Sequence, residues 1–373
     1  MVKTVFILGA GVSRAAGGPL MYDFIDKALQ ILQSNRAGWA FPHFRHVFEA
    51  RRKLQAAYAK SNLDIDNIEN LFATFEMASL IKHLSNMSDE DTSALPRDLR
   101  FLIMRTLEQS VRYPIYADDP IVGSPSPYDA FVELLIQMEE TTLLSPTAII
   151  SFNYDLLLEY AFTVREMEID YGLKNTTKHK DAIPLYKLHG SLNWTFNQVG
   201  NEIESFRLQK LPAESYWRRY GVYECPLRRP IDTMELIHGP DGWGDKPVPD
   251  PLIVPPTWSK GQYHEKLSSV WYNASRALST AENIFVIGYS LPPADQFFRA
   301  FFALSTMSDS LIERLWVFDP SEIAARYQSL VGAAISSRDK FRYERVIFSD
   351  AIVFLAKSFG FDEKPFRYLL SRG

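Results

Sequence analysis

Five short apolar runs, each followed by glycine or polar residues, constrain the fold of this 373-residue chain more than any other feature. The runs occupy residues 4–8, 148–152, 284–287, 315–318 and 346–348. A continuous apolar run of this length is typical of a parallel strand that is covered on both faces. Between two of the runs, apolar residues recur at helical spacing over about 264–282 and predict a crossover helix. This alternation predicts an α/β fold with a Rossmann-like, doubly wound parallel sheet.

Helical periodicity dominates the stretch between the first two of these strands. One helical face there is formed by Ile68, Leu71, Phe72, Phe75 and Ala78. The preceding Asp66-Asn-Ile-Glu69 resembles a capping box with Asp66 as the cap. We therefore predict a helical insertion at 31–139 within a Rossmann-like domain of residues 1–30 and 140–373. Pro, Gly and Trp are frequent at 195–260, and we expect a small irregular lobe there.

Net charge and cysteine content narrow the class of protein. The net charge is −5, so the chain lacks the basic footprint that usually accompanies nucleic-acid binding. The single cysteine, Cys225, can form neither a disulfide framework nor a four-cysteine zinc site and fits a cytoplasmic location. The N-terminal apolar run superficially resembles a secretory signal, but Gly9 and Gly11 interrupt it and favour a buried strand. No apolar stretch reaches the ~20 residues that span a bilayer, so we expect no membrane association.

The turn after the first strand carries the first candidate ligand-binding residues. Gly9-Ala10-Gly11 lets the backbone turn tightly and approach a pyrophosphate, whose charge is favoured by free N–H groups at the following helix start. The dinucleotide fingerprint expects a third glycine where this chain has Arg14, so a plain strand-to-helix turn is an equal alternative. Gly17-Gly18-Pro19 adds a second flexible turn, which suggests a loop over a bound nucleotide.

Polar side chains follow two further strands where ligands of doubly wound sheets bind. Asn153 can orient a ribose hydroxyl or a water, and Asp155 can accept a hydrogen bond from a carboxamide. An Asx turn that starts a helix explains these two residues equally well. His189 follows a third apolar run, and a neutral imidazole there can take a proton near pH 7. Taken alone, however, a histidine after a strand is more often a hydrogen-bonded core residue.

Two later strands end in residues that suit the rest of a dinucleotide. Gly288 and Ser290 follow one strand, where a backbone amide and a hydroxyl can meet phosphate or ribose. Asp295 is expected to cap the next helix, whose Phe stripe is typical of a core. Asp319 ends another strand and can bind the hydroxyls of the adenosine ribose, although a turn-forming Asp is equally consistent.

Together these motifs resemble the sirtuin superfamily, and specifically its prokaryotic sirtuin-like branch. The resemblance rests on five segments in family order: Gly9-Ala-Gly-Val-Ser13, Phe152-Asn-Tyr-Asp155, Lys187-Leu-His-Gly-Ser-Leu-Asn-Trp194, Ile253-Val-Pro-Pro-Thr-Trp258 and Ile287-Gly-Tyr-Ser-Leu-Pro292. In that family the glycine turn binds NAD phosphates, Asn and Asp frame the nicotinamide ribose, and His is the catalytic base. By resemblance, phosphate binding falls to Gly9, Ala10, Gly11 and Ser13, and the catalytic roles fall to Asn153, Asp155 and His189.

Two departures from the family pattern bear on function. Protein deacylases of the family carry a zinc ribbon with two cysteine pairs, which one cysteine cannot supply, so we expect no metal. After Pro19 the sequence continues Leu-Met-Tyr before Asp23-Phe24, which departs from the family's Pro-Asp-Phe-Arg loop. Sirtuin-like proteins without the ribbon and with helical insertions resemble bacterial antiphage effectors that hydrolyse NAD and deplete the cell of it.

The sequence therefore favours an NAD glycohydrolase that uses NAD as its substrate and releases nicotinamide and ADP-ribose. Asn153 would orient ribose and water, His189 would assist proton removal and Asp155 would hold the carboxamide. The alternatives are an NAD-dependent deacylase or ADP-ribosyltransferase, and a non-catalytic module that binds NAD or ADP-ribose. By resemblance we also expect a homo-oligomer and a trigger protein, such as a co-encoded ATPase, that contacts the helical insertion.

Overall fold

The computed structural model describes residues 1–56, 63–141, 143–174, 181–197, 202–220, 226–242, 244, 247–254, 261–292, 295–307, 311–332, 335 and 340–372. A seven-stranded parallel sheet organises this part of the chain, in the order β13-β12-β11-β1-β3-β5-β4. Its strands are β1 (Thr4–Leu8), β3 (Thr147–Ser151), β4 (Ile169–Asp170), β5 (Ile183–Lys187), β11 (Asn283–Ile287), β12 (Arg314–Phe318) and β13 (Phe341–Glu344). The sheet confirms the predicted α/β, Rossmann-like fold.

The strand order reverses beside β1. From β1 the chain adds β3 and β5 on one side, and later adds β11, β12 and β13 on the other. The strands β1, β3 and β11 are entirely buried, as their continuous apolar sequences predict. Ligands of doubly wound sheets bind outside the carboxyl ends of the strands at such a reversal. The fold therefore favours a ligand site at the carboxyl ends of β1 and its neighbours.

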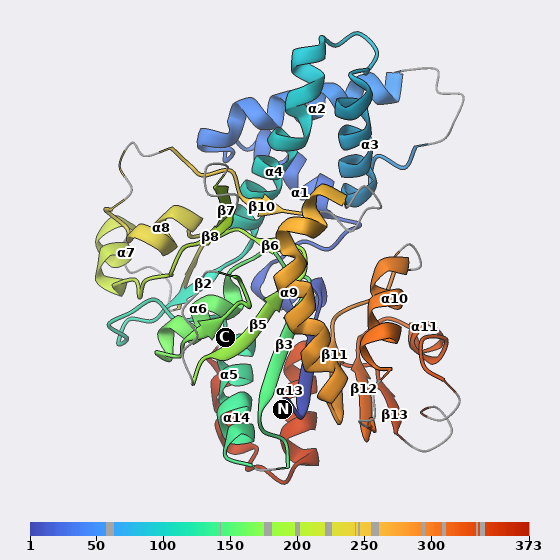
Figure 1. Ribbon diagram of the computed structural model, residues 1–373. Helices are drawn as coiled ribbons and strands as arrows, with labels where there is room; N and C mark the ends of the chain where they lie inside the picture. The colour runs from blue at the N-terminus through green and yellow to red at the C-terminus, as the bar shows by residue number, and fades with distance from the viewer. Residues whose placement is uncertain are drawn as a thin grey trace.

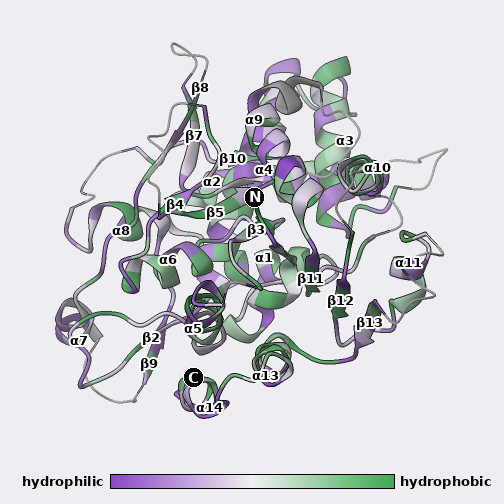
Figure 2. Ribbon diagram, turned by 60° about the horizontal axis from the view of Figure 1, so that its bottom comes forward, coloured by the Kyte–Doolittle hydropathy of each residue, from purple (hydrophilic) through white to green (hydrophobic). Residues whose placement is uncertain are grey.

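Helices cover both faces of the sheet (Figure 2). One layer contains α5 (Ser126–Glu139), α13 (Phe348–Ser358) and α14 (Lys364–Ser371), and the other contains α9 (Gly261–Thr280) and α10 (Gln296–Ser305). Phe6 of β1 packs edge-on against Phe131 of α5, with 5.0 Å between ring centroids. On the opposite face, α9 contacts β5 and α10. The predicted crossover helix is thus confirmed as α9.

The remaining helices between β1 and β3 gather away from the start of β1, at the top of Figure 1. They are α1 (Phe24–Gln33), α2 (Phe41–Ala56), α3 (Ile68–Ile81) and α4 (Asp89–Ser110), with a short 3-10 turn, η2 (Gly38–Ala40), before α2. The face of α3 that periodicity predicts is buried against this cluster. None of the helices in the described ranges is both long and apolar enough to cross a membrane.

Short elements fill the segment that follows β5. They are β6 (Gly190–Ser191), β7 (Trp194–Asn197), β8 (Glu202–Ser205), α7 (Ala213–Tyr220), β9 (Leu227–Arg229), α8 (Thr233–His238) and β10 (Leu252–Ile253). β7 pairs with β8, β10 with β6, and β9 with β2 (Tyr113–Ile115), all antiparallel. β9 therefore joins this segment to the chain just after α4. A further helix, α6 (Leu157–Val164), follows β3, and α11 (Ala324–Gln328) follows β12.

Three local expectations were wrong. The apolar triplet at 346–348 is no strand, because Phe348 begins α13 and the last strand is β13 at the sheet edge, where a half-exposed sequence suffices. The cap of α3 is Asn67, whose side chain accepts from the N–H groups of Glu69 and Asn70, while Asp66 pairs with Arg51. The glycine turn leads into a 3-10 helix, η1 (Ala10–Ala16), rather than directly into an α-helix.

Candidate active site

The strand register places the predicted site residues along one edge of the sheet. Phe318, Ile287, Leu8, Ser151 and Lys187 are successive partners on β12, β11, β1, β3 and β5. The residues that follow them include Asp319, Gly288, Gly9, Asn153 and His189. The strands that precede Asp319 and His189 are four inter-strand spacings apart, which corresponds to about 19 Å. The edge therefore gathers, from segments far apart in sequence, the groups that an extended dinucleotide needs.

The glycines at this edge allow two backbones to touch. A Cβ at Gly9 would lie 2.6 Å from the carbonyl oxygen of Gly288, and one at Gly11 would lie 2.7 Å from the Cα of Gly288. Gly288 itself has φ +64°, which favours glycine. The N–H of Gly9 donates to Ile287 and that of Gly11 to Gly288. Both amides are thus used within the protein, so neither the N–H of Gly9 nor that of Gly11 in η1 is free for a phosphate.

A buried hydrogen-bond network joins the glycine turn to the residues after β3. The amide Nδ2 of Asn153 donates to the carbonyl oxygen of Gly9 at 3.1 Å and to the Oγ of Ser13 at 3.2 Å. Ser13 in turn donates to the Oδ2 of Asp155 at 2.7 Å and lies 2.8 Å from the hydroxyl of Tyr128. Burial raises the pKa of Tyr128, so its phenol is neutral and can donate to Ser13. Four of the predicted site residues, Gly9, Ser13, Asn153 and Asp155, are therefore linked by hydrogen bonds.

The backbone carbonyl of Gly9 fixes the orientation of the Asn153 amide. A carbonyl oxygen can only accept, so the atom 3.1 Å from it must be the donor Nδ2. Both Nδ2 hydrogens are then used, by Gly9 and Ser13. Within the described parts of the chain, no residue donates to Oδ1 of Asn153, whose side chain remains 9% exposed. This oxygen is the atom of Asn153 that can accept from a ribose hydroxyl or a water.

Asp155 forms the Asx turn that is one of the two interpretations made from the sequence. Its Oδ1 accepts from the N–H of Leu157 at 3.2 Å, which forms the Asx turn before α6. Its Oδ2 accepts from Ser13, as described above. The carboxylate is thus held in place by the start of a helix and by the glycine turn together.

His189 lies beside the aromatic side chains that follow β3. Its ring packs edge-on against Phe152 with 5.1 Å between centroids, and its carbonyl accepts from the N–H of Val254. The residue is 7% exposed, so His189 is a buried residue. Gly190 after it has φ +86°, and a Cβ there would overlap the carbonyl oxygen of Leu252. This glycine allows β6 to approach β10 directly behind His189.

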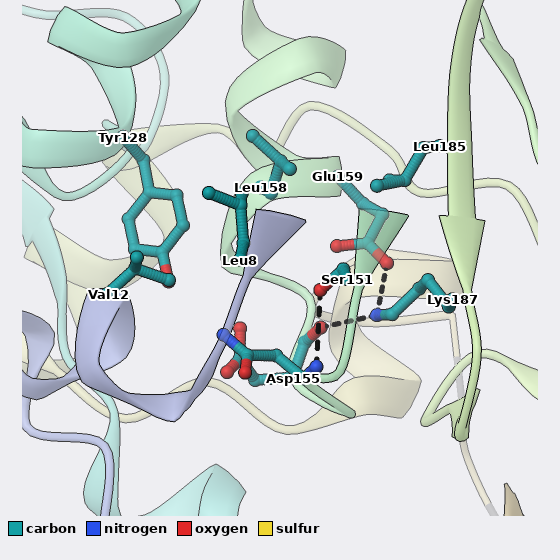
Figure 3. A pocket seen from close by; sticks show the side chains of 10 residues that line it. Leu8, Val12, Tyr128, Ser151, Asp155, Leu158, Glu159, Leu185 and Lys187 are labelled. Atoms are coloured by element: carbon teal, nitrogen blue, oxygen red, sulfur yellow. Dashed lines mark hydrogen bonds and ion pairs between the residues drawn. The ribbon is translucent and has the colours of Figure 1, made fainter. Parts of the chain in front are cut away.

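A lysine–glutamate pair lies beneath this edge (Figure 3). Lys187, the last residue of β5, is 1% exposed and contacts the Oε1 of Glu159 on α6. Burial raises the pKa of Glu159, an effect that the Lys187 ammonium opposes. A cavity of about 10 Å³, lined by Asn153, Asp155, Glu159, Lys187 and others, adjoins the pair. That volume is about what one buried water requires, so this cavity alone is far too small for a dinucleotide.

The other predicted binding residues lie in the segments that follow β1, β11 and β12. Ser290 is exposed, and its carbonyl accepts from Arg326 at 2.9 Å. Asp319 is buried and accepts from the N–H of Ser321 through Oδ1, the turn-forming arrangement left open above. Pro19 is buried after Gly18, and Ala10, half-buried, begins η1. Residues 255–258 of one sirtuin-like segment, and Cys225, lie outside the described residues.

Sequence reasoning missed the side chains that support the site from below. These side chains are those of Tyr128, Glu159 and Lys187, which support the site together with Ser13. Each of the three lies within an apolar helix or strand, whose sequence predicts only core packing. Lys187 and Glu159 offered the available signal, because a charged residue within a buried element needs a partner. Throughout the ranges that the structure describes, no group of three or more His, Cys, Asp or Glu side chains is placed to hold a metal ion.

Comparison with known proteins identifies one family over part of the chain. Residues 147–233 match the family model described as SIR2-like domain. This segment contains Asn153, Asp155 and His189, so the match confirms the sirtuin-like resemblance of the two motifs that carry them. No curated protein matches the chain.

Solved structures show weak likenesses over most of the chain. One is Sir2Tm bound to a propionylated peptide, at 13% identity and a TM-score of 0.36, with 96% of this chain and 94% of that chain covered. Another is a Sir2 homologue mutant in complex with ADP-ribose, at 14% identity and a TM-score of 0.42, with 99% and 93% covered. The fold assignment rests on the strand order given above.

Proposed function

We propose that this chain, of which residues 147–233 match the SIR2-like domain model, is an NAD glycohydrolase, which cleaves NAD to nicotinamide and ADP-ribose. The SIR2-like domain supports NAD-dependent chemistry in general. One observation carries the finer proposal: Asn153 and His189 each stand two residues beyond Ser151 and Lys187, which are partners on adjacent parallel strands. Both residues therefore lie at the same edge of the sheet, Asn153 one strand and His189 two strands away from the glycine turn.

The reaction breaks the bond between the ribose C1′ and the nicotinamide nitrogen. Its transition state has oxocarbenium character, so catalysis depends on ordering the dinucleotide and excluding bulk water. Water then forms the new bond to C1′, nicotinamide leaves with the bonding electron pair, and a base accepts the proton of the water. His189 is the proposed base, since an imidazole titrates near neutral pH.

Asn153 and Asp155 have complementary parts in this proposal. The Oδ1 of Asn153 accepts from a ribose hydroxyl or from the attacking water, because Nδ2 is committed to Gly9 and Ser13. Asp155, held by Ser13 and Leu157, accepts from the nicotinamide carboxamide. Gly9, Ala10, Gly11, Ser13, Pro19, Gly288, Ser290 and Asp319 are the proposed contacts to the rest of the dinucleotide. Since Gly9 and Gly11 use their N–H groups internally, their contribution is close backbone approach.

Incubation of the purified chain with NAD alone tests the proposal. Nicotinamide and ADP-ribose should appear in equal amounts without any acyl peptide. Release that requires an acylated peptide or a protein acceptor would instead indicate a deacylase or an ADP-ribosyltransferase. Binding of NAD without turnover, also after addition of candidate trigger proteins, would indicate a binding module.

We extend the proposal to a role as an antiphage effector that depletes cellular NAD, since hydrolysis without an acceptor consumes NAD unproductively. In this role the chain acts as a homo-oligomer in the cytoplasm, and a trigger protein that contacts α1–α4 activates its hydrolysis of NAD. Induced expression should lower cellular NAD, and the His189→Ala variant should not. A monodisperse monomer with full unstimulated turnover would contradict the regulated, oligomeric form of the proposal.

A further inference from the structure

The ammonium group of Lys187 occupies the point where the two loops of the candidate active site meet. A lysine has three N–H donors, and here they have three close acceptors: the Oε1 of Glu159, the carbonyl oxygen of Asp155 at 2.7 Å and the Oγ of Ser191 at 2.8 Å. The carbonyl of Tyr154 lies further away, at 3.4 Å. Figure 3 shows the side chain reaching from β5 toward Glu159 and Asp155.

Each of these acceptors belongs to a segment that carries or adjoins a site residue. Asp155 lies in the loop after β3, two residues beyond Asn153. Ser191 lies two residues beyond His189, in β6. The two loops also touch directly, because the N–H of Leu192 donates to the carbonyl of Tyr154 at 3.1 Å. Lys187 therefore holds together the segment that bears Asn153 and the segment that bears His189.

The network continues from Lys187 to Phe206, the residue after β8. Ser191 accepts from Lys187 and donates to the Oδ1 of Asn193 at 2.7 Å. Asn193 donates through Nδ2 to the carbonyl of Phe206 at 2.7 Å. The three residues of this network, Lys187, Ser191 and Asn193, are each at most 1% exposed. A fully satisfied polar network inside the core specifies one arrangement of the backbone that it joins.

We propose that Lys187 is a positioning residue that fixes the separation of Asn153 and His189. This inference rests on the proposed function. It gives the buried ammonium group of Lys187 a structural role beyond its ion pair with Glu159. An ion pair needs one carboxylate, whereas Lys187 also donates to a backbone carbonyl and to a hydroxyl from different loops. We call the hydrogen bonds of Lys187 to the two loops the clamp. A shift of about 1 Å between reacting groups can lower a rate about 100-fold, so loss of the clamp should lower kcat.

The test compares variants that remove the charge pair with a variant of a matched lysine elsewhere in the fold. Lys187→Met leaves Glu159 buried without its cation and is expected to fold poorly. The double variant Lys187→Met/Glu159→Leu replaces the pair with apolar side chains of similar size, so the fold should be retained. Lys340→Met is the control, because Lys340 also donates to a backbone carbonyl and a glutamate, those of Ile312 and Glu313, on the far side of the sheet.

For the double variant we expect kcat to fall about 10- to 100-fold while KM for NAD changes less than about 3-fold. Lys340→Met should keep both values. A double variant that folds and keeps kcat within about 3-fold of the parent would overturn the proposal, because Lys187 would then serve only to neutralise Glu159.

Amide hydrogen exchange separates this inference from the proposed function. Segments 153–156 and 188–193 should exchange faster in the double variant than in the parent or in Lys340→Met. If the parent chain does not cleave NAD, the proposed function fails, and faster exchange in both segments still supports the clamp. Unchanged exchange in both segments overturns the clamp, whatever the activity of the parent.

Discussion

The Nδ2 of Asn153 lies 3.1 Å from the carbonyl oxygen of Gly9, so the loop after β3 is bonded to the turn after β1. This contact joins residues that are 144 positions apart in the chain, and it does so at the point where the strand order of the sheet reverses. It also directs the amide oxygen of Asn153 away from the carbonyl of Gly9. A residue that stabilises the turn thereby presents an acceptor at the carboxyl edge of the sheet.

Replacement of Asn153 by alanine should abolish most NAD cleavage while the fold survives. Loss of a preorganised polar group costs about 100- to 1000-fold in kcat, and the two lost hydrogen bonds cost about 2 kcal/mol of unfolding free energy. Asn273→Ala is the matched control, because Asn273 also donates to two backbone carbonyls, those of Gly172 and Ser269, but lies on α9. Equal losses of turnover in the two variants would show that the effect is structural.

Replacement of His189 by alanine should lower kcat about 100- to 10,000-fold, the usual contribution of a general base. The fold should lose the ring contact with Phe152, worth about 1 kcal/mol. Nicotinamide release and thermal unfolding measure the two effects separately. His83→Ala, at an exposed position, should change neither. Retention of more than about a tenth of the turnover in His189→Ala would exclude the assigned role.

The sequence predicted the sheet and the order of its edge residues because buried parallel strands are apolar runs that end in recognisable turns. It could not predict β13, whose half-exposed Phe341–Glu344 lacks such a run. Nor could it assign the hydrogen bonds of Gly9 and Gly11, because those depend on the backbone of Ile287 and Gly288, far along the chain. Lys187 and Glu159 were missed for the same reason, since a pairing between β5 and α6 leaves no periodic signal.

Replacement of Gly11 by alanine should disturb both stability and nucleotide binding. The new Cβ would lie 2.7 Å from the Cα of Gly288, a contact that neither backbone can relieve without moving. We expect a loss of about 1–3 kcal/mol in unfolding free energy, typical of overpacking, together with weaker binding of ADP-ribose. Denaturant titration and calorimetry measure these two quantities. Gly332→Ala, where a Cβ meets nothing within 4 Å, should leave both unchanged.

The buried Glu108 should make stability depend on pH. Burial raises the pKa of this carboxyl from 4.5 to about 7, and the nearby Asp232 adds to the effect while Arg105 opposes it. The folded state therefore binds the proton more tightly, so the stabilisation from Glu108 is complete below pH 4.5 and is lost as the pH rises through about 7.

The variant Glu108→Gln tests this pH dependence, because glutamine keeps an acceptor for the N–H of Thr233. Between about pH 4.5 and 8, its unfolding free energy relative to the parent should rise by up to about 3 kcal/mol. Glu214→Gln, at an exposed position, should show no such trend. A difference between Glu108→Gln and the parent that does not vary with pH would contradict the prediction.

A crystal structure of the Asn153→Ala variant with NAD tests the central claim most directly, since slow turnover should preserve the bound substrate. The account predicts that the nicotinamide ribose lies at the carboxyl ends of β3 and β5, within hydrogen-bond distance of His189, with the diphosphate over Gly9–Gly11. NAD bound away from this edge, or with its glycosidic bond out of reach of His189, would contradict the account.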